Sequence, residues 1–304
     1  MALLDGIGLR SAPDRLEELA SALDAGLSAA TAATAAGIRG NIAEGVSGAL
    51  GRSKFGLAEH EVELLAACER AGRLPDALRL LATVIRKRTE RRRNAARRLA
   101  YPTLLVAFAC ILLVTVVKSG GPTAVVTAVL VGAVLAAAVG GGLRLRRARR
   151  DPGSDPERWP IVGKLCRDAS EAPYLTAMHA LHGAGVGLRD AHAIAVRSVP
   201  FAATRARLLL AGPLLAAGRG FSEALGSTGA LGRESLEILE RAEPIGGLED
   251  AFARAALRRG DALERGLDRA SHALGGIAYA GSALLVFVVF LKFYGGWFSS
   301  AGLR

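Results

Sequence analysis

Two glutamates and two aspartates stand at matching positions of a pattern that occurs twice. The pattern Glu-x-x-Gly-x-Leu-x-Asp occupies residues 69–76 and again 243–250, an offset of 174 residues. In each copy the glutamate comes before a glycine that should break a helix, and the aspartate lies in the first turn of the next helix. Acidic side chains at a helix N-terminus offset the helix dipole and can tie two helices together. The repeated turn is expected to contain Glu69, Gly72, Leu74, Asp76, Glu243, Gly246, Leu248 and Asp250.

Helix capping is the favoured role of these acids, and two other roles stay open. The turns are also candidates for docking a partner protein or for holding a cation. One or two carboxylates are too few to complete a calcium shell, so we assign no metal ligand there.

Histidine offers the other candidate chemistry. His179 and His182 are three residues apart on one helix face, and His192 is near in sequence. Two imidazoles at that spacing can hold a metal, but no cysteine or carboxylate completes a recognisable ligand set. The glycine-rich stretch 183–187 lacks the Lys-Ser/Thr of a phosphate loop. We expect no catalytic residue, no cofactor and no metal, and a membrane-tethered metalloenzyme is only a minor alternative.

Long apolar runs dominate the middle and the end of the chain. Residues 99–117 and 123–143 are 19 and 21 residues without a charge, which is the length of a transmembrane helix. A third span is expected at 275–296, where aromatic residues extend the apolar run. Tyr101 and Pro102 suit the point where the chain enters the membrane. A buried hairpin of a soluble protein is the alternative, and it rarely contains two such runs.

Small residues recur every fourth position in the second run. They form a face on which another helix can pack closely, although alanine and glycine are abundant throughout the chain. The face consists of Ala124, Ala128, Gly132, Ala136 and Gly140.

The positive charge is concentrated beside the apolar runs. Segments 86–98 and 144–150 hold 13 of the 39 basic residues and one of the 28 acidic residues, which leaves 26 against 27 elsewhere. Lysine and arginine remain on the cytoplasmic side, so both ends of the hairpin should face inward. Anionic lipid headgroups are the natural counter-charge there, and nucleic acid is not an expected partner.

The predicted fold is all-α, because alternating strand patterns are scarce. It has two related cytoplasmic helical-bundle domains and three transmembrane helices. The expected order is a shortened first domain at 1–98, a transmembrane hairpin at 99–143, a basic linker at 144–160, a second domain at 161–274, a third span at 275–296 and a periplasmic tail at 297–304.

A wider self-similarity supports duplication of the helical domain. Residues 45–50 recur at 220–225, an offset of 175, and the Ala-Gly pair at 25–26 recurs at 184–185, an offset of 159. The ordered pattern resembles the inner-membrane platform proteins of type II secretion and type IV pilus machines, which contain duplicated F domains. Residues 67–74 are similar to the A-G-E-x-S-G-x-L turn of that family. Tyr101-Pro102 and segments 160–165 and 183–188 are similar to further family motifs in the same order.

The chain also departs from the family, as a divergent member would. Cys68 and Ala71 replace the usual glycine and serine of the turn, Pro244 interrupts the second copy, and the first domain is shortened. The resemblance implies a non-enzymatic inner-membrane scaffold with its N-terminus in the cytoplasm and its C-terminus in the periplasm. The implied partners are a cytoplasmic secretion ATPase, pilin-like or pseudopilin subunits, other inner-membrane machine components, the lipid bilayer and further copies of the chain. A small multi-pass transporter or channel component is the alternative.

Overall fold

The computed structural model describes residues 12–38, 45–53, 55–90, 93, 140–160 and 162–300. The regular secondary structure in these ranges is helical, which confirms the all-α prediction for them. The chain divides into two compact units. Unit 1 contains residues 1–90 and 147–264, and unit 2 contains residues 91–146 and 265–304.

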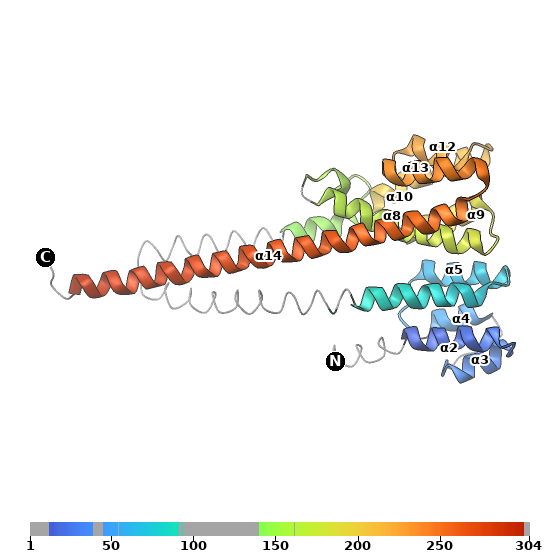
Figure 1. Ribbon diagram of the computed structural model, residues 1–304, viewed down its shortest axis with the longest axis horizontal. Coiled ribbons are helices and arrows are strands. Elements are labelled where there is room, and N and C mark those ends of the chain that lie inside the picture. Colours follow the sequence, from blue (N-terminus) through green and yellow to red (C-terminus); the bar gives the residue numbers. More distant parts are fainter. Residues whose placement is uncertain are drawn as a thin grey trace. The chain divides into compact units, whose positions relative to one another are not determined.

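The first part of unit 1 is a series of short helices followed by a longer one, coloured blue to cyan in Figure 1. Ser28 accepts a hydrogen bond from the Thr31 N–H at 3.3 Å and so caps the second of the described helices. The elements are α2 (Ala12–Asp24), α3 (Ala29–Ala35), α4 (Gly45–Arg52), α5 (Glu59–Arg70) and a helix over residues 74–90.

The second part of unit 1 begins with a short 3-10 turn and ends on a long helix that continues into unit 2. Its elements are η2 (Pro156–Arg158), α8 (Gly163–Gly183), α9 (Leu188–Ala195), η3 (Val196–Ser198), α10 (Ala202–Leu209), α11 (Ala211–Ala216), α12 (Phe221–Thr228), α13 (Arg233–Ala242), η4 (Glu243–Ile245) and α14 (Leu248–Ser300).

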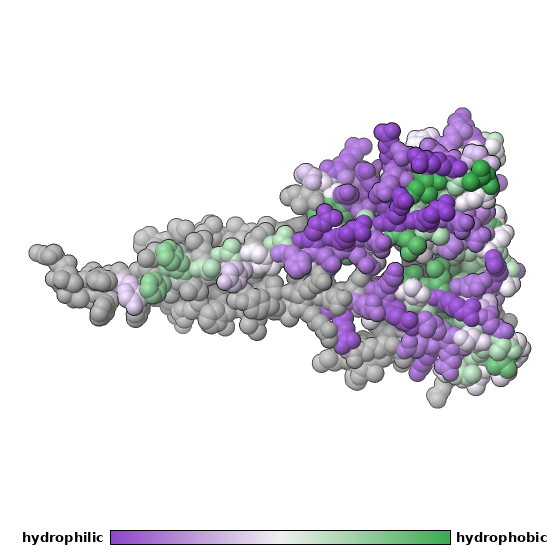
Figure 2. Space-filling view, viewed as in Figure 1, coloured by the Kyte–Doolittle hydropathy of each residue, from purple (hydrophilic) through white to green (hydrophobic). Residues whose placement is uncertain are grey.

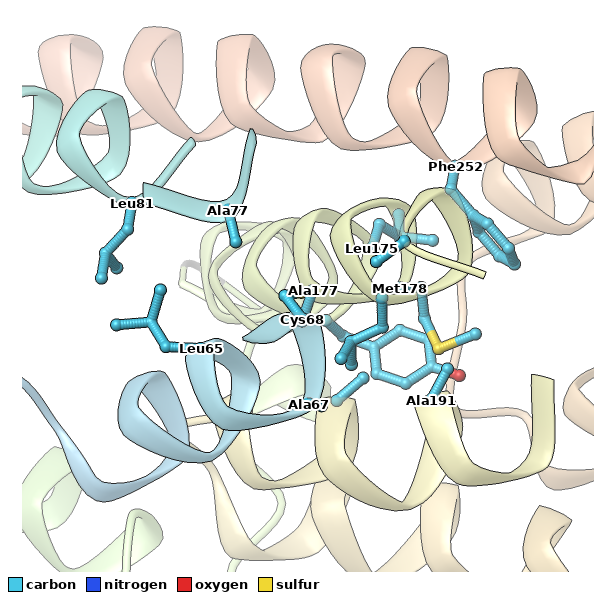
Figure 3. Packing of buried hydrophobic residues seen from close by; sticks show 14 of the residues in the cluster. Leu65, Ala67, Cys68, Ala77, Leu81, Leu175, Ala177, Met178, Ala191 and Phe252 are labelled. Atoms are coloured by element: carbon cyan, nitrogen blue, oxygen red, sulfur yellow. The ribbon is translucent and has the colours of Figure 1, made fainter. Parts of the chain in front are cut away.

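One hydrophobic core joins both parts of unit 1. Leu65 and Cys68 of α5 belong to the same buried cluster as Met178 of α8 and Phe252 of α14 (Figure 3). Burying a side chain of this size stabilises the fold by about 1.5–3 kcal/mol. The two predicted helical domains, 1–98 and 161–274, therefore share a core, and the boundary between them stays a prediction.

The predicted linker is docked at its C-terminal end. The Glu157 side chain is only 2% exposed, accepts a hydrogen bond from Thr204 and lies 2.7 Å from an Arg207 nitrogen. A Cβ added at Gly163 would be 2.3 Å from the Glu157 carbonyl oxygen, so α8 can begin this close to the linker only with glycine. The segment around Glu157 thus packs against α8 and α10.

The three predicted membrane spans are not confirmed by the structure. In the part of the chain that the structure describes, no helix has the combined length and apolar character needed to cross a membrane. The third span at 275–296, within α14, is not confirmed. Residues 99–139, which hold most of the predicted hairpin, lie outside the described residues, as do 301–304. Hydrophilic side chains cover much of the described surface of unit 1 in the view of Figure 2.

Candidate functional site: the two repeated helix turns

The two copies of the sequence pattern form turns with the same backbone conformation. Gly72 follows α5 with φ of +74°, and Gly246 follows η4 with φ of +71°. These left-handed values favour glycine, because a Cβ would be strained there. In the first copy the Arg73 N–H donates to the Cys68 carbonyl at 2.9 Å, and the matching bond of the second copy is 3.0 Å long.

Glu69 caps the helix that precedes its own. Its carboxylate accepts hydrogen bonds from the backbone N–H groups of Val46 at 2.8 Å and Ser47 at 3.1 Å, and from the Ser47 hydroxyl at 2.5 Å. These donors belong to the first turn of α4. A Cβ at Gly45 would be 2.9 Å from the carboxylate, so glycine there makes room for it. One side chain thereby joins the end of α5 to the start of α4.

Glu243 makes the same contacts in the second copy. It accepts hydrogen bonds from the N–H groups of Phe221 and Ser222, the latter at 2.9 Å, and from the Ser222 hydroxyl. Burial raises the pKa of Glu243, but these hydrogen bonds outweigh burial and hold the pKa below its usual value. Gly220 occupies the position that Gly45 has in the first copy. A Cβ added at Gly220 would lie 3.3 Å from the Glu243 carboxylate.

The geometry supports a capping role more directly than a cation site. The oxygens of both glutamates point at N–H and O–H donors, whereas a cation needs oxygens that are free to accept it. Among the described residues, no group of three or more histidine, cysteine or acidic side chains is placed to hold a metal. The dipole that each glutamate offsets is that of α4 or α12, upstream, rather than that of the following helix.

The other residues of the pattern separate into buried and exposed positions. Leu74 is 7% exposed and Leu248 is 6% exposed, and both belong to the shared core. Asp76 is exposed and lies 3.5 Å from Arg73 and 3.8 Å from a nitrogen of Arg79. Asp250 is also exposed but has no ion pair with any residue that the structure describes. The aspartates therefore differ between the copies, although the glutamates do not.

A polar cleft of about 430 Å³ lies beside the first turn. Arg73, Asp76 and Arg79 line one side, and His179, Gly183 and Glu249 line the other. Arg73 donates a hydrogen bond to the Gly183 carbonyl, and His179 Nδ1 lies 3.3 Å from the Glu249 carbonyl. The cleft contains two arginines and two carboxylates, so its charges largely cancel.

The histidines singled out by spacing have separate surroundings. His192 is buried, with Nδ1 2.8 Å from the Tyr174 hydroxyl and Nε2 3.0 Å from the Leu208 carbonyl. Burial lowers the pKa of His192, and the bond to Leu208 opposes this only partly. His182 packs against the Phe252 ring, and His179 faces the cleft. The structure thus gives these three imidazoles no common centre.

An ion cluster that sequence reasoning missed lies in the second part of unit 1. Arg259 is 7% exposed and lies 3.1 Å from Asp168 and 2.9 Å from Glu171. Glu171 also accepts hydrogen bonds from Gly232 N–H and the Ser235 hydroxyl, both at 2.6 Å. Burial raises the pKa of Glu171, while these donors and Arg259 act in the opposite direction. Arg259 and Asp168 are 91 residues apart, so no local motif marks the cluster.

Other predicted residues cannot be placed. Tyr101, Pro102, Ala124, Ala128, Gly132 and Ala136 lie outside the described residues. Gly140 is the first residue of a described helical segment, with nothing within 4 Å of a built Cβ. The helix-packing face therefore remains a prediction.

Comparison with known proteins gives a family match over the region that contains the Glu69 turn. No curated protein matches the chain. Residues 14–119 match the family described as "Type II secretion system (T2SS), protein F". That range contains α4, α5 and the Glu69 turn, together with the first predicted span. The sequence resemblance is confirmed over residues 14–119, where the chain matches the type II secretion system protein F family.

Proposed function

We propose that the chain is a non-enzymatic inner-membrane platform protein of a type II secretion or type IV pilus machine. In this role it binds a cytoplasmic secretion ATPase and couples that ATPase to pilin-like subunits. The N-terminus and both helical regions lie in the cytoplasm, and the short tail lies in the periplasm. The observation that carries the proposal is the family match over residues 14–119.

The geometry of unit 1 supports a scaffold role. The same carboxylate-capped turn occurs in both copies, and the two copies share one core. A scaffold that transmits motion needs such cross-links, because loosely connected helices would absorb a displacement rather than pass it on. The polar cleft at the first turn presents arginine and carboxylate side chains, which are suited to binding a polar partner surface.

The exposed aspartate of the second turn is a suitable place to test partner docking. Asp250 has no ion pair among the described residues, so its replacement breaks no such contact there. Asp190, in the first turn of α9, is likewise exposed and provides a matched control. Docking of a basic ATPase surface at the turn predicts that Asp250→Arg weakens ATPase binding and that Asp190→Arg does not.

The experiment is a mild-detergent pull-down of the tagged full chain from its native host, with cross-linking and mass spectrometry. Recovery of a secretion ATPase with pilin-like subunits supports the platform role. Equal ATPase recovery by both aspartate variants would move the docking surface away from the second turn. Recovery of the chain alone after cross-linking would contradict the platform role and favour a transporter or channel component.

A further inference from the structure

Two arginines of the first basic flank are paired with carboxylates of the protein. In the first flank, Arg86 lies 2.9 Å from Glu17 and 3.3 Å from Asp14, and Arg88 lies 2.9 Å from Glu61. The carboxylates come from α2 and α5. These arginines therefore fasten the helix over residues 74–90 to its neighbours, and their charge is largely neutralised within the protein.

The arginines of the second flank have no such partners. They lie on or directly after a helix over residues 140–148 and are exposed, and none has an ion pair with any residue that the structure describes. They are Arg144, Arg146, Arg147, Arg149 and Arg150. The nearby Asp151 forms no ion pair with them, and its Oδ1 accepts a hydrogen bond from the Gly153 N–H at 2.9 Å.

Two of these arginines share one face of that helix with a leucine, and a third lies in the turn that closes it. Leu143, Arg146 and Arg147 follow the i, i+3, i+4 spacing that places side chains on a single side. Arg150 follows in the turn, where its N–H donates to the Arg147 carbonyl at 2.8 Å. Ala148 lies on the other side of the helix and is fully buried. Leu143 is 51% exposed, so an apolar side chain stands beside two unpaired guanidinium groups.

This combination fits one kind of partner. Guanidinium groups bind phosphate oxygens through paired hydrogen bonds, and their affinity increases where several converge. The arginines directly follow the uncharged run 123–143, whose last residue is Leu143, and this places them at headgroup depth in the proposed function. An exposed leucine suits the boundary between headgroups and acyl chains. A nucleic acid would use the arginines but not the leucine.

We propose that Arg146, Arg147 and Arg150 form a binding face for the phosphate of anionic phospholipids, with Leu143 against the acyl chains. The proposal rests on the membrane location given by the proposed function. The first flank has no equivalent role at Arg86 and Arg88, because their guanidinium groups are already paired. The face thus concentrates anionic lipid on one side of the helical segment that leads into the second part of unit 1.

The test compares three forms of the full chain in detergent. The variant form carries Arg146→Gln, Arg147→Gln and Arg150→Gln. The matched control carries Arg70→Gln, Arg189→Gln and Arg254→Gln, which remove the same charge from exposed arginines that have no ion pair among the described residues. Native mass spectrometry measures binding of phosphatidylglycerol and of phosphatidylcholine to each form. We expect the wild type and the control to prefer phosphatidylglycerol by about tenfold, and the variant to lose that preference.

Other outcomes overturn the proposal. Equal preference in all three forms would mean that the face does not bind the lipid. Displacement of phosphatidylglycerol by inorganic phosphate would show a free-phosphate site instead, and tighter binding of a short DNA duplex that the variant loses would show a nucleic-acid surface. Cell fractionation keeps the two proposals apart. A chain found outside the membrane fraction contradicts the proposed function, whereas a membrane-bound chain without lipid preference contradicts only this inference.

Discussion

At the scale of single residues, the capping glutamates are the chemistry that the two copies have in common. Each carboxylate binds two backbone N–H groups and a serine hydroxyl at the start of a helix. The sequence indicated an acid near a helix N-terminus, and the types and spacing of Glu69 and Glu243 were enough for that. The sequence did not indicate which helix each glutamate caps, because the capped residues Ser47 and Ser222 lie more than 20 residues upstream of the glutamates.

We expect Glu243→Gln to lower the free energy of unfolding by about 1 kcal/mol at neutral pH, because an uncharged amide is a weaker acceptor for the N–H groups of α12. Thermal unfolding of the full chain in detergent measures this. Glu240→Gln is the control, since Glu240 is exposed on α13, the helix directly before Glu243, without a hydrogen bond to a described residue. Equal losses in the two variants would contradict the capping role.

The pH dependence of that difference follows from the direction of the pKa shift. The pKa of Glu243 is lower in the folded chain than in the unfolded chain, so the carboxylate stabilises the fold above the unfolded value of about 4.3. This stabilisation is lost as the pH falls through the folded pKa. The difference in the free energy of unfolding between wild type and Glu243→Gln should therefore be constant from pH 7 to about 5 and shrink below that. A difference that grew on acidification would contradict the assignment.

At the scale of elements, the segment before α8 illustrates what the sequence could not predict. Three prolines and a glycine in residues 151–160 are typical of a linker. The side chain of Glu157 nevertheless docks on α10, and the start of α8 lies against its carbonyl group. The contact joins residues 50 positions apart, and no local pattern reports such a contact.

Replacing Gly163 by alanine should loosen this contact. The added Cβ would meet the Glu157 carbonyl oxygen at 2.3 Å, so the backbone must move. We expect a loss of about 1–3 kcal/mol of stability and faster proteolysis within residues 151–160. Gly212→Ala is the matched control, because nothing lies within 4 Å of a Cβ there and the residue is helical. Unchanged proteolysis of Gly163→Ala would mean that the segment is not held by this approach.

At the scale of the whole molecule, the duplicated sequence does not produce two independent cores. Ala67 of α5 is 4% exposed in the shared core, whereas Arg241 occupies the matching position of α13 and is exposed. The residues at this matching position thus differ with their surroundings: α5 has a small side chain where it packs in the core, and α13 has a charged one where it meets solvent. The sequence predicted the repeat and the helical class, but the pairing of α5 with α8 and α9 depends on contacts more than 100 residues apart.

Giving the first copy the residue of the second should separate the two parts of unit 1. Ala67→Arg places a charge in the shared core, and we expect a loss of more than about 3 kcal/mol. Hydrogen exchange should then increase in α5 and α8 together. Ala66→Glu, which also copies the residue found at the matching position of α13, should have a much smaller effect because Ala66 is only partly buried. An increase in hydrogen exchange confined to α5 would argue against a shared core.

The docking of Glu157 also determines where the chain accepts a label. Residues 151–153 are exposed and form a turn, so a short epitope or a fluorophore placed there leaves the neighbouring contacts intact. A label placed at Glu157 would break the contact with Arg207 and displace the start of α8. A fluorophore within the exposed turn would report on the helix over residues 140–148 and on α8 at the same time.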